Sequence, residues 1–176
     1  MDYKILKKIS EKDIRKKVEE IAHNISEEYK DTEPVLIGVL NGSFIFIADL
    51  IRKISIPTKV DFIRLASYGP NSISSGNIKL TKDIELLLRG KPVIIVEDII
   101  DTGLTLSYLI KHIKKKSPES IRVCTLINKF GLRQNKIGID YQGFEIEEGF
   151  LVGYGLDYSE KYRHLPYILS LEIQTN

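Results

Sequence analysis

Three acidic residues, Glu97, Asp98 and Asp101, lie within five positions of VIIVEDIIDTGLTL (93–106), directly after an apolar run. The DTGLT segment that follows is typical of a strand leading into a helix, and a helix N-terminus offers N–H groups and partial positive charge to a phosphate. Carboxylates beside a phosphate repel it unless a hard cation intervenes, which points to Mg²⁺. The carboxylates could alternatively hydrogen-bond sugar hydroxyls. These residues therefore indicate a site for a phosphorylated sugar with a metal.

Each of these residues also has a simpler interpretation. Asp101 or Thr102 could cap the following helix, and Glu97 and Asp98 could be solvated groups at a strand end. Adjacent residues in a strand face opposite ways, so Glu97 and Asp98 should serve different partners. The sequence contains no G-x-x-x-x-G-K-[ST] and no G-x-G-x-x-G, since GYGLDY (153–158) lacks the third glycine. A P-loop nucleotidase and a dinucleotide-binding dehydrogenase are both disfavoured.

The elements around this stretch alternate between strands and helices. Helical spacing of apolar residues predicts helices at about 11–30, at 44–53 and behind Leu106, Leu109, Ile110 and Ile113. Buried strands are predicted at 35–40, 60–68, 93–98 and 121–128, and shorter strand-like pieces at 143–147, 150–157 and 166–173. GPNSISSGN (69–77) predicts a mobile loop or a long hairpin between two strands. This order predicts an α/β protein with a mostly parallel sheet and helices on both faces.

In such sheets ligands bind outside the carboxyl ends of the strands, so the loops after Leu40, Val96 and Asn128 matter most.

The length of 176 residues fits one domain, and the contents of 43% apolar and 28% charged residues are ordinary for a globular protein. A net charge of +2 is too small to argue for nucleic acid, and no apolar stretch is long enough for a membrane span. The single cysteine, Cys124, is expected in the core of a cytoplasmic protein, because one thiol forms neither an internal disulfide nor a metal cage.

The stretch 93–106 resembles the phosphoribosyl-pyrophosphate signature of type I phosphoribosyltransferases, with two acids, two apolar residues and D-T-G-x-T. Four further motifs are similar to the hypoxanthine–guanine branch of that family. They are VLNGSFIF (39–46), SYG (67–69), NKFGLR (128–133) and GFEIEEGFLVGYGLDYSEKYRHLPYI (143–168). The resemblance implies a Rossmann-like core with a small hood formed by the terminal segments. It also implies transfer of the phosphoribosyl group to N9 of hypoxanthine or guanine, with Mg²⁺ as cofactor and a homodimer or homotetramer as the assembly.

The resemblance also implies a role for each matching residue. Asp101 would be the general acid–base group at N7 of the purine, and Ser67 and Tyr68 would begin a loop that closes over the site. Arg133 is left as a surface residue or a contact to a neighbouring subunit. The bond Leu40–Asn41 can be cis in this family, although an ordinary Asn-Gly turn is the simpler alternative. The remaining roles are ribose and 5′-phosphate binding by Glu97, Asp98, Thr102, Gly103, Leu104 and Thr105; pyrophosphate binding by Leu40, Asn41, Gly42 and Arg163; base binding by Lys129, Phe150, Leu151 and Asp157; and metal binding by Glu97, Asp98 and Asp157.

Two other functions stay open at this point. One is a xanthine-preferring transferase or a transferase for another base, which the segment 150–157 disfavours. The other is a regulator that senses phosphoribosyl pyrophosphate without turnover. Such regulators usually carry an added DNA-binding segment, whereas the first ~34 residues here fit one helix.

Overall fold

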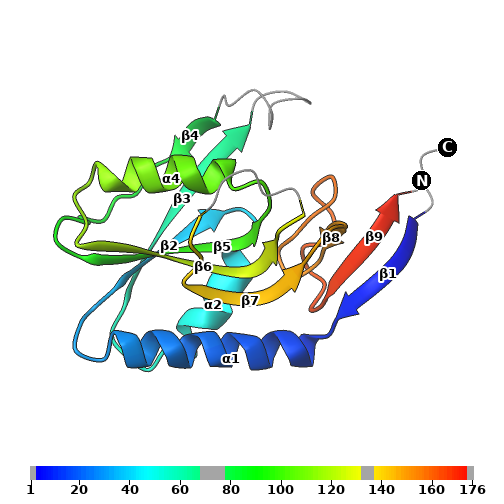
Figure 1. Ribbon diagram of the computed structural model, residues 1–176, viewed down its shortest axis with the longest axis horizontal. Helices are drawn as coiled ribbons and strands as arrows, with labels where there is room; N and C mark the ends of the chain where they lie inside the picture. The colour runs from blue at the N-terminus through cyan, green and yellow to red at the C-terminus, as the bar shows by residue number, and fades with distance from the viewer. Residues whose placement is uncertain (1–2, 68–77, 132–136, 174–176) are drawn as a thin grey trace.

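The central sheet has six strands in the order β4-β3-β2-β5-β6-β7. The computed structural model describes residues 3–67, 78–131 and 137–173 (Figure 1). Five of the strands run parallel, and β4 pairs antiparallel with β3 at one edge, so the predicted mostly parallel sheet is confirmed. The strands are β2 (Val35–Leu40), β3 (Lys59–Ser67), β4 (Ile78–Lys82), β5 (Pro92–Ile100), β6 (Ser120–Lys129) and β7 (Tyr141–Ile146).

Helices cover both faces of this sheet, as the alternation of elements predicted (Figure 1). Helices α1 (Glu11–Glu28) and α2 (Phe44–Ile51) pack on one face and α4 (Leu104–Lys114) on the other. The hydroxyl of Ser10 accepts a hydrogen bond from the Asp13 N–H at 3.2 Å, which caps α1. Cys124 is fully buried in the core, as expected. No helix within the described residues is long and apolar enough to cross a membrane.

A second, antiparallel sheet of three strands, in the order β1-β9-β8, forms the predicted hood beside the central sheet (Figure 1). It consists of β1 (Tyr3–Ile9), β8 (Phe150–Val152) and β9 (Ile168–Ile173). The expectation that the N-terminal segment holds only one helix was wrong for β1. That strand forms because β9, from the other end of the chain, pairs with it from Tyr3↔Ile173 to Ile9↔Ile168. The register shifts between Ile5 and Lys7, which breaks the period-2 pattern by which a strand is recognised in sequence.

The central sheet opens where β2 and β5 part. Their pairing ends at Gly38↔Val96, whereas the pairing of β5 with β6 continues to Ile100↔Asn128. The apolar pattern of β5 predicted that this strand ends near Glu97 and Asp98. Strand β5 instead continues to Ile100, because β6 supplies ladder partners beyond these acids. The chain leaves β2 toward one edge of the sheet and β5 toward the other, which makes this gap a topological switch point. Ligands of α/β proteins bind at such points.

Strands β3 and β4 form the predicted hairpin, in which Ser67 pairs with Ile78 next to the connecting segment. The expected closing loop falls mostly on residues 68–77. Those residues, Tyr68 among them, lie outside the described part of the chain.

Candidate active site

A cleft of about 370 Å³ lies at the gap between β2 and β5, between the central sheet and the hood. It brings together predicted residues from six separate places in the chain. They are Asn41, Gly42, Asp98, Asp101, Lys129, Phe150, Leu151, Asp157 and Arg163. Ile99, Gly149 and Leu156 also line the cleft, and the sequence had not singled them out. The predicted residues Leu40, Glu97 and 102–105 lie outside this lining.

The turn after β2 forms one wall of the cleft. The peptide bond between Leu40 and Asn41 is cis, which the family resemblance allowed and an ordinary Asn-Gly turn would not require. Gly42 lies directly against Asp98, since a Cβ at this position would be 1.7 Å from Asp98 Oδ2. Only glycine lets the backbone approach that carboxylate so closely. The turn is closed by Ser43, whose hydroxyl donates to the Val39 carbonyl at 2.6 Å.

Glu97 is buried and Asp98 is half-buried, so the structure does not support their simpler interpretation as solvated groups at a strand end. Burial and the neighbouring charge of Asp98 raise the pKa of the Glu97 carboxyl well above its usual range. Burial also raises the pKa of Asp98 to about 6, although backbone N–H groups and Arg163 oppose the rise. Only Asp98 lines the cleft, which agrees with the opposite orientations expected of neighbouring strand residues.

Asp101 faces Lys129 across the cleft floor. Asp101 directly follows β5 and Lys129 ends the adjacent strand β6, and Lys129 Nζ lies 3.0 Å from Asp101 Oδ2. Helix α4 begins after Gly103 and has no side-chain cap, so the structure does not support a capping role for Asp101. The lysine is 14% exposed and the aspartate 38% exposed at the side chain. A carboxylate and an ammonium group are therefore held together at the edge of a cavity, where proton transfer to a ligand is possible.

Thr102 and Gly103 lead into α4, whose first residues are Leu104 and Thr105, and all four lie outside the lining of the 370 Å³ cleft. Gly103 has the left-handed φ of 83°, and Thr102 Oγ1 accepts a long hydrogen bond of 3.4 Å from the Leu104 N–H. The N–H groups of a first helical turn have no intrahelical acceptor and favour an anion. Leu104 brings no positive charge, so binding at this loop would rest on N–H groups and hydroxyls.

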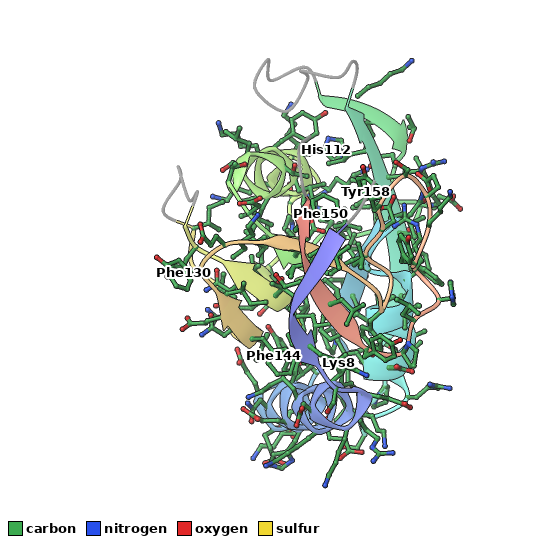
Figure 2. All side chains as sticks on the ribbon, turned by 90° about the vertical axis from the view of Figure 1, so that its right-hand side faces the viewer. Lys8, His112, Phe130, Phe144, Phe150 and Tyr158 are labelled. Carbon is green, nitrogen blue, oxygen red and sulfur yellow. The ribbon has the colours of Figure 1, made fainter. Side chains whose placement is uncertain are left out.

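The opposite wall comes from the hood and the segment after it. The ring of Phe150 is 38% exposed and meets Tyr158 edge-on, with centroids 5.3 Å apart (Figure 2). Phe150 therefore places a partly exposed aromatic ring in the cleft lining, where a flat ligand could stack on it. Arg163 bridges this wall, with Nη2 2.8 Å from Asp157 Oδ1 and Nη1 donating to the Gly155 carbonyl at 2.7 Å.

Some sequence predictions were incomplete and some fall on residues that are not described. Ile99 was expected only to pack the strand, but it also lines the cleft, whereas Ile100 is buried. Its position between two cleft acids was the one available signal. Tyr154, which follows β8, was not predicted to take part in the site at all. Arg133 and Tyr68 lie outside the described residues, and Ser67 is described only as the backbone end of β3.

The fold agrees with a family comparison. The chain belongs to the phosphoribosyl transferase domain family, which its residues 7–159 match. The chain is 47% identical over 160 residues to the hypoxanthine-guanine phosphoribosyltransferase of Bacillus subtilis, covering 91% of this chain and 89% of that one. It is 43% identical to the hypoxanthine phosphoribosyltransferase of Escherichia coli K12, with 91% of each covered. A solved hypoxanthine-guanine phosphoribosyltransferase of Bacillus anthracis superimposes with a TM-score of 0.90 at 45% identity, covering 95% and 99% of the two chains.

Proposed function

We propose that this protein transfers the 5-phosphoribosyl group from phosphoribosyl pyrophosphate to N9 of hypoxanthine or guanine, releasing pyrophosphate and forming IMP or GMP. The observation that best supports this proposal is one cleft that unites the turn at Asn41 and Gly42, the Asp98 carboxylate, the Asp101–Lys129 pair and the aromatic ring of Phe150. The similar proteins named above support the same reaction and its place in purine salvage.

The base is proposed to bind between Phe150 and the Asp101–Lys129 pair. Lys129 would donate to the 6-oxo group while Phe150 stacks on the ring and the main chain of Leu151 contacts the Watson–Crick edge. A main-chain carbonyl accepts from N1–H of hypoxanthine or the amino group of guanine, but xanthine presents an oxygen there. We therefore expect xanthine to bind poorly, because two acceptors would face each other.

The bond-making step joins N9 to C1′ while the bond from C1′ to the pyrophosphate oxygen breaks. Asp101 would exchange a proton at N7, and its ion pair with Lys129, with 3.0 Å between Oδ2 and Nζ, would keep the carboxyl oriented toward the base. Asn41 and Gly42 of the turn and Arg163 of the opposite wall would hold the pyrophosphate. Arg suits this role because its planar fork of N–H donors matches phosphate oxygens.

Mg²⁺ fits the carboxylates of this site. Within the described residues no group of three or more His, Cys, Asp or Glu side chains forms a closed metal cage. That suits Mg²⁺, which is usually bound by one or two carboxylates together with substrate oxygens and water. Asp98 would hold it beside the ribose and Asp157 beside the pyrophosphate, where it would neutralise charge on the leaving group; the position of Glu97 outside the cleft lining does not support a direct contact of Glu97 with the metal. Burial disfavours the charged forms of Glu97 and Asp98, so a cation there would stabilise both.

The test is a turnover assay with Mg²⁺, phosphoribosyl pyrophosphate and hypoxanthine, guanine, xanthine, adenine or uracil in separate reactions. Nucleotide formation from hypoxanthine or guanine is expected. Xanthine as the best substrate would favour the xanthine-preferring alternative. Binding of phosphoribosyl pyrophosphate without turnover of any base would favour the regulator.

Asp101→Asn tests the chemical role directly. It should lower kcat by roughly 10²–10⁴-fold, because an amide cannot exchange the N7 proton. Asp140→Asn is a matched control: Asp140 also pairs with a cation, Arg122 at 2.9 Å, but it precedes β7 at the amino end of that strand. Asp140→Asn should leave kcat unchanged, and equal losses in the two variants would refute the assignment.

The assembly and location of the protein are also proposals. A homodimer or homotetramer in the cytoplasm is proposed, with small molecules rather than nucleic acid or membrane as partners. The role of the C-terminal region in the oligomeric state of Trypanosoma cruzi hypoxanthine phosphoribosyl transferase, a structural neighbour at 38% identity, supports an oligomer. Light scattering of the purified protein tests this, and a monomer at assay concentration would contradict it.

A further inference from the structure

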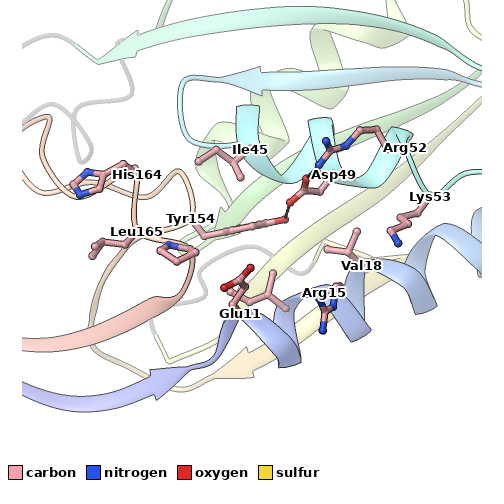
Figure 3. A pocket seen from close by; sticks show the side chains of 12 residues that line it. Glu11, Arg15, Val18, Ile45, Asp49, Arg52, Lys53, Tyr154, His164 and Leu165 are labelled. Atoms are coloured by element: carbon pink, nitrogen blue, oxygen red, sulfur yellow. Dashed lines mark hydrogen bonds and ion pairs between the residues drawn. The ribbon is translucent and has the colours of Figure 1, made fainter.

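Tyr154 connects the hood side of the cleft to helix α2. It follows β8, between Gly153 and Gly155, and it is only 5% exposed. Its hydroxyl donates to Asp49 Oδ2 of α2 at 2.6 Å (Figure 3). Burial and this hydrogen bond both raise the pKa of the Tyr154 hydroxyl, so it remains a protonated donor at any pH at which the protein works.

Helix α2 is the direct continuation of the turn that forms the pyrophosphate wall. It begins at Phe44, two residues after Gly42, and the Ile47 N–H donates back to the Ser43 carbonyl at 2.9 Å. Phe46, Ile47 and Leu50 are buried in the core, which fixes the helix to the sheet. A contact to Asp49 therefore acts on a rigid element that directly follows the turn proposed to bind pyrophosphate.

The neighbour of Tyr154 touches that same turn. A Cβ on Gly155 would be 2.1 Å from the Gly42 carbonyl oxygen, and a Cβ on Gly42 would be 1.7 Å from Asp98 Oδ2. Gly155 thus packs against the backbone of Gly42, and Gly42 packs against the side chain of Asp98. Gly155 also forms two hydrogen bonds with Arg163. Its N–H donates to the Arg163 carbonyl at 3.0 Å, and its carbonyl accepts from Arg163 Nη1 at 2.7 Å. A displacement of residues 153–155 would move both proposed pyrophosphate-binding groups, the turn and the arginine.

We propose that Tyr154 is a positioning residue for pyrophosphate: its hydrogen bond to Asp49 fixes the hood segment against α2 and so sets the spacing between the 41–42 turn and Arg163. This inference rests on the proposed function and adds to it a residue that does not line the 370 Å³ cleft. Loss of the Tyr154 hydrogen bond is therefore expected to weaken the binding of phosphoribosyl pyrophosphate but not the binding of the purine base.

A cavity behind Tyr154 makes the idea testable without loss of the fold. This cavity of about 540 Å³ is lined by Tyr154, Asp49 and Arg52, together with residues of α1 and the segment 164–166 (Figure 3). The Asp49 side chain is 33% exposed and forms an ion pair with Arg52. When the tyrosine hydroxyl is removed, Asp49 keeps its ion pair with Arg52 and its contact with water. No buried charge is therefore left without a partner.

The experiment compares Tyr154→Phe with Tyr141→Phe by steady-state kinetics, and measures binding of Mg²⁺–phosphoribosyl pyrophosphate by calorimetry. Tyr154→Phe should raise KM and Kd for phosphoribosyl pyrophosphate on the order of tenfold, the usual effect of losing a hydrogen bond to a charged group. The KM for hypoxanthine should change less than about twofold, because the base-binding residues are not displaced. Asp49→Asn keeps an acceptor oxygen and should retain near-wild-type values, whereas Asp49→Ala should behave like Tyr154→Phe.

Tyr141→Phe is the matched control because Tyr141 is also a buried phenol that donates to a carboxylate, that of Glu28, away from the cleft. It should leave both KM values unchanged. If Tyr154→Phe loses only thermal stability, or raises both KM values equally, the positioning role is overturned. A wild-type protein without turnover would contradict the proposed function, yet calorimetry would still test the role of Tyr154. A wild-type protein that does not bind phosphoribosyl pyrophosphate would overturn both.

Discussion

The contact between Gly155 and Gly42 offers the sharpest test of how the cleft is built, through the substitution Gly155→Ala. The new Cβ would lie 2.1 Å from the Gly42 carbonyl oxygen, and backbone atoms cannot escape by a rotamer change. Gly155 also has φ of 98°, a conformation that favours glycine. Both effects disfavour the native position of the segment that leads to Asp157 and Arg163.

The magnitude follows from two separate terms. Strain of a non-glycine residue at this φ should cost about 1–3 kcal/mol of the free energy of unfolding. To restore ordinary contact the segment must also move by roughly 1 Å, and a displacement of that size at a reacting centre costs on the order of 10²-fold in rate. We therefore expect kcat/KM for phosphoribosyl pyrophosphate to fall by about two orders of magnitude while the protein remains folded.

The assay is steady-state kinetics with hypoxanthine as the base, alongside thermal unfolding. Gly90→Ala is the matched control, because Gly90 also has a positive φ of 66° but no atom lies within 4 Å of the position that its Cβ would take. It should lose stability by about 1–2 kcal/mol and keep wild-type kinetics. Wild-type kcat/KM in Gly155→Ala would refute the inference that this contact sets the cleft geometry.

Two further predictions concern stability. Leu109→Ala should lower the free energy of unfolding by about 2–5 kcal/mol, because this α4 side chain is fully buried, whereas Leu87→Ala, at a residue 82% exposed, should change it by less than about 0.5 kcal/mol in denaturant titrations. Burial alone would raise the pKa of Asp83, but hydrogen bonds from His112, the Ile84 N–H and Lys116 lower it from 3.8 to about 2. The folded pKa is the lower one, so this stabilisation is present above about pH 4 and is lost as pH falls toward 2. The stability difference between wild type and Asp83→Asn should shrink over that interval, and a constant difference in unfolding curves would contradict the assignment.

Much of the site could be predicted from the sequence because parallel strands end at a common edge. The acids after Val96, the turn after Leu40 and the lysine after Asn128 each follow a buried apolar run. Once the runs are recognised as parallel strands, these residues must meet. The structure confirms this with the cleft that joins Gly42, Asp98 and Lys129.

Other features depend on pairings between distant segments, for which the local pattern carries little signal. Strand β1 forms only because β9 lies beside it, and the register shift hides its alternation. The extension of β5 to Ile100 depends on ladder partners from β6, although acids interrupt its apolar run. The periodicity of apolar residues in a segment indicates whether the segment is buried, but it does not indicate which other segment packs beside it.

The sequence by itself determined the class of fold, the order of its elements and the edge of the sheet at which the chemistry lies, because these follow from hydrophobic period and motif spacing. The tertiary structure alone decided that Glu97 lies outside the cleft lining, that Asp101 meets Lys129 and that Tyr154 binds Asp49. The physical reason is that such contacts depend on distances of about 3 Å between segments far apart in the chain. Packing of the whole core sets those distances.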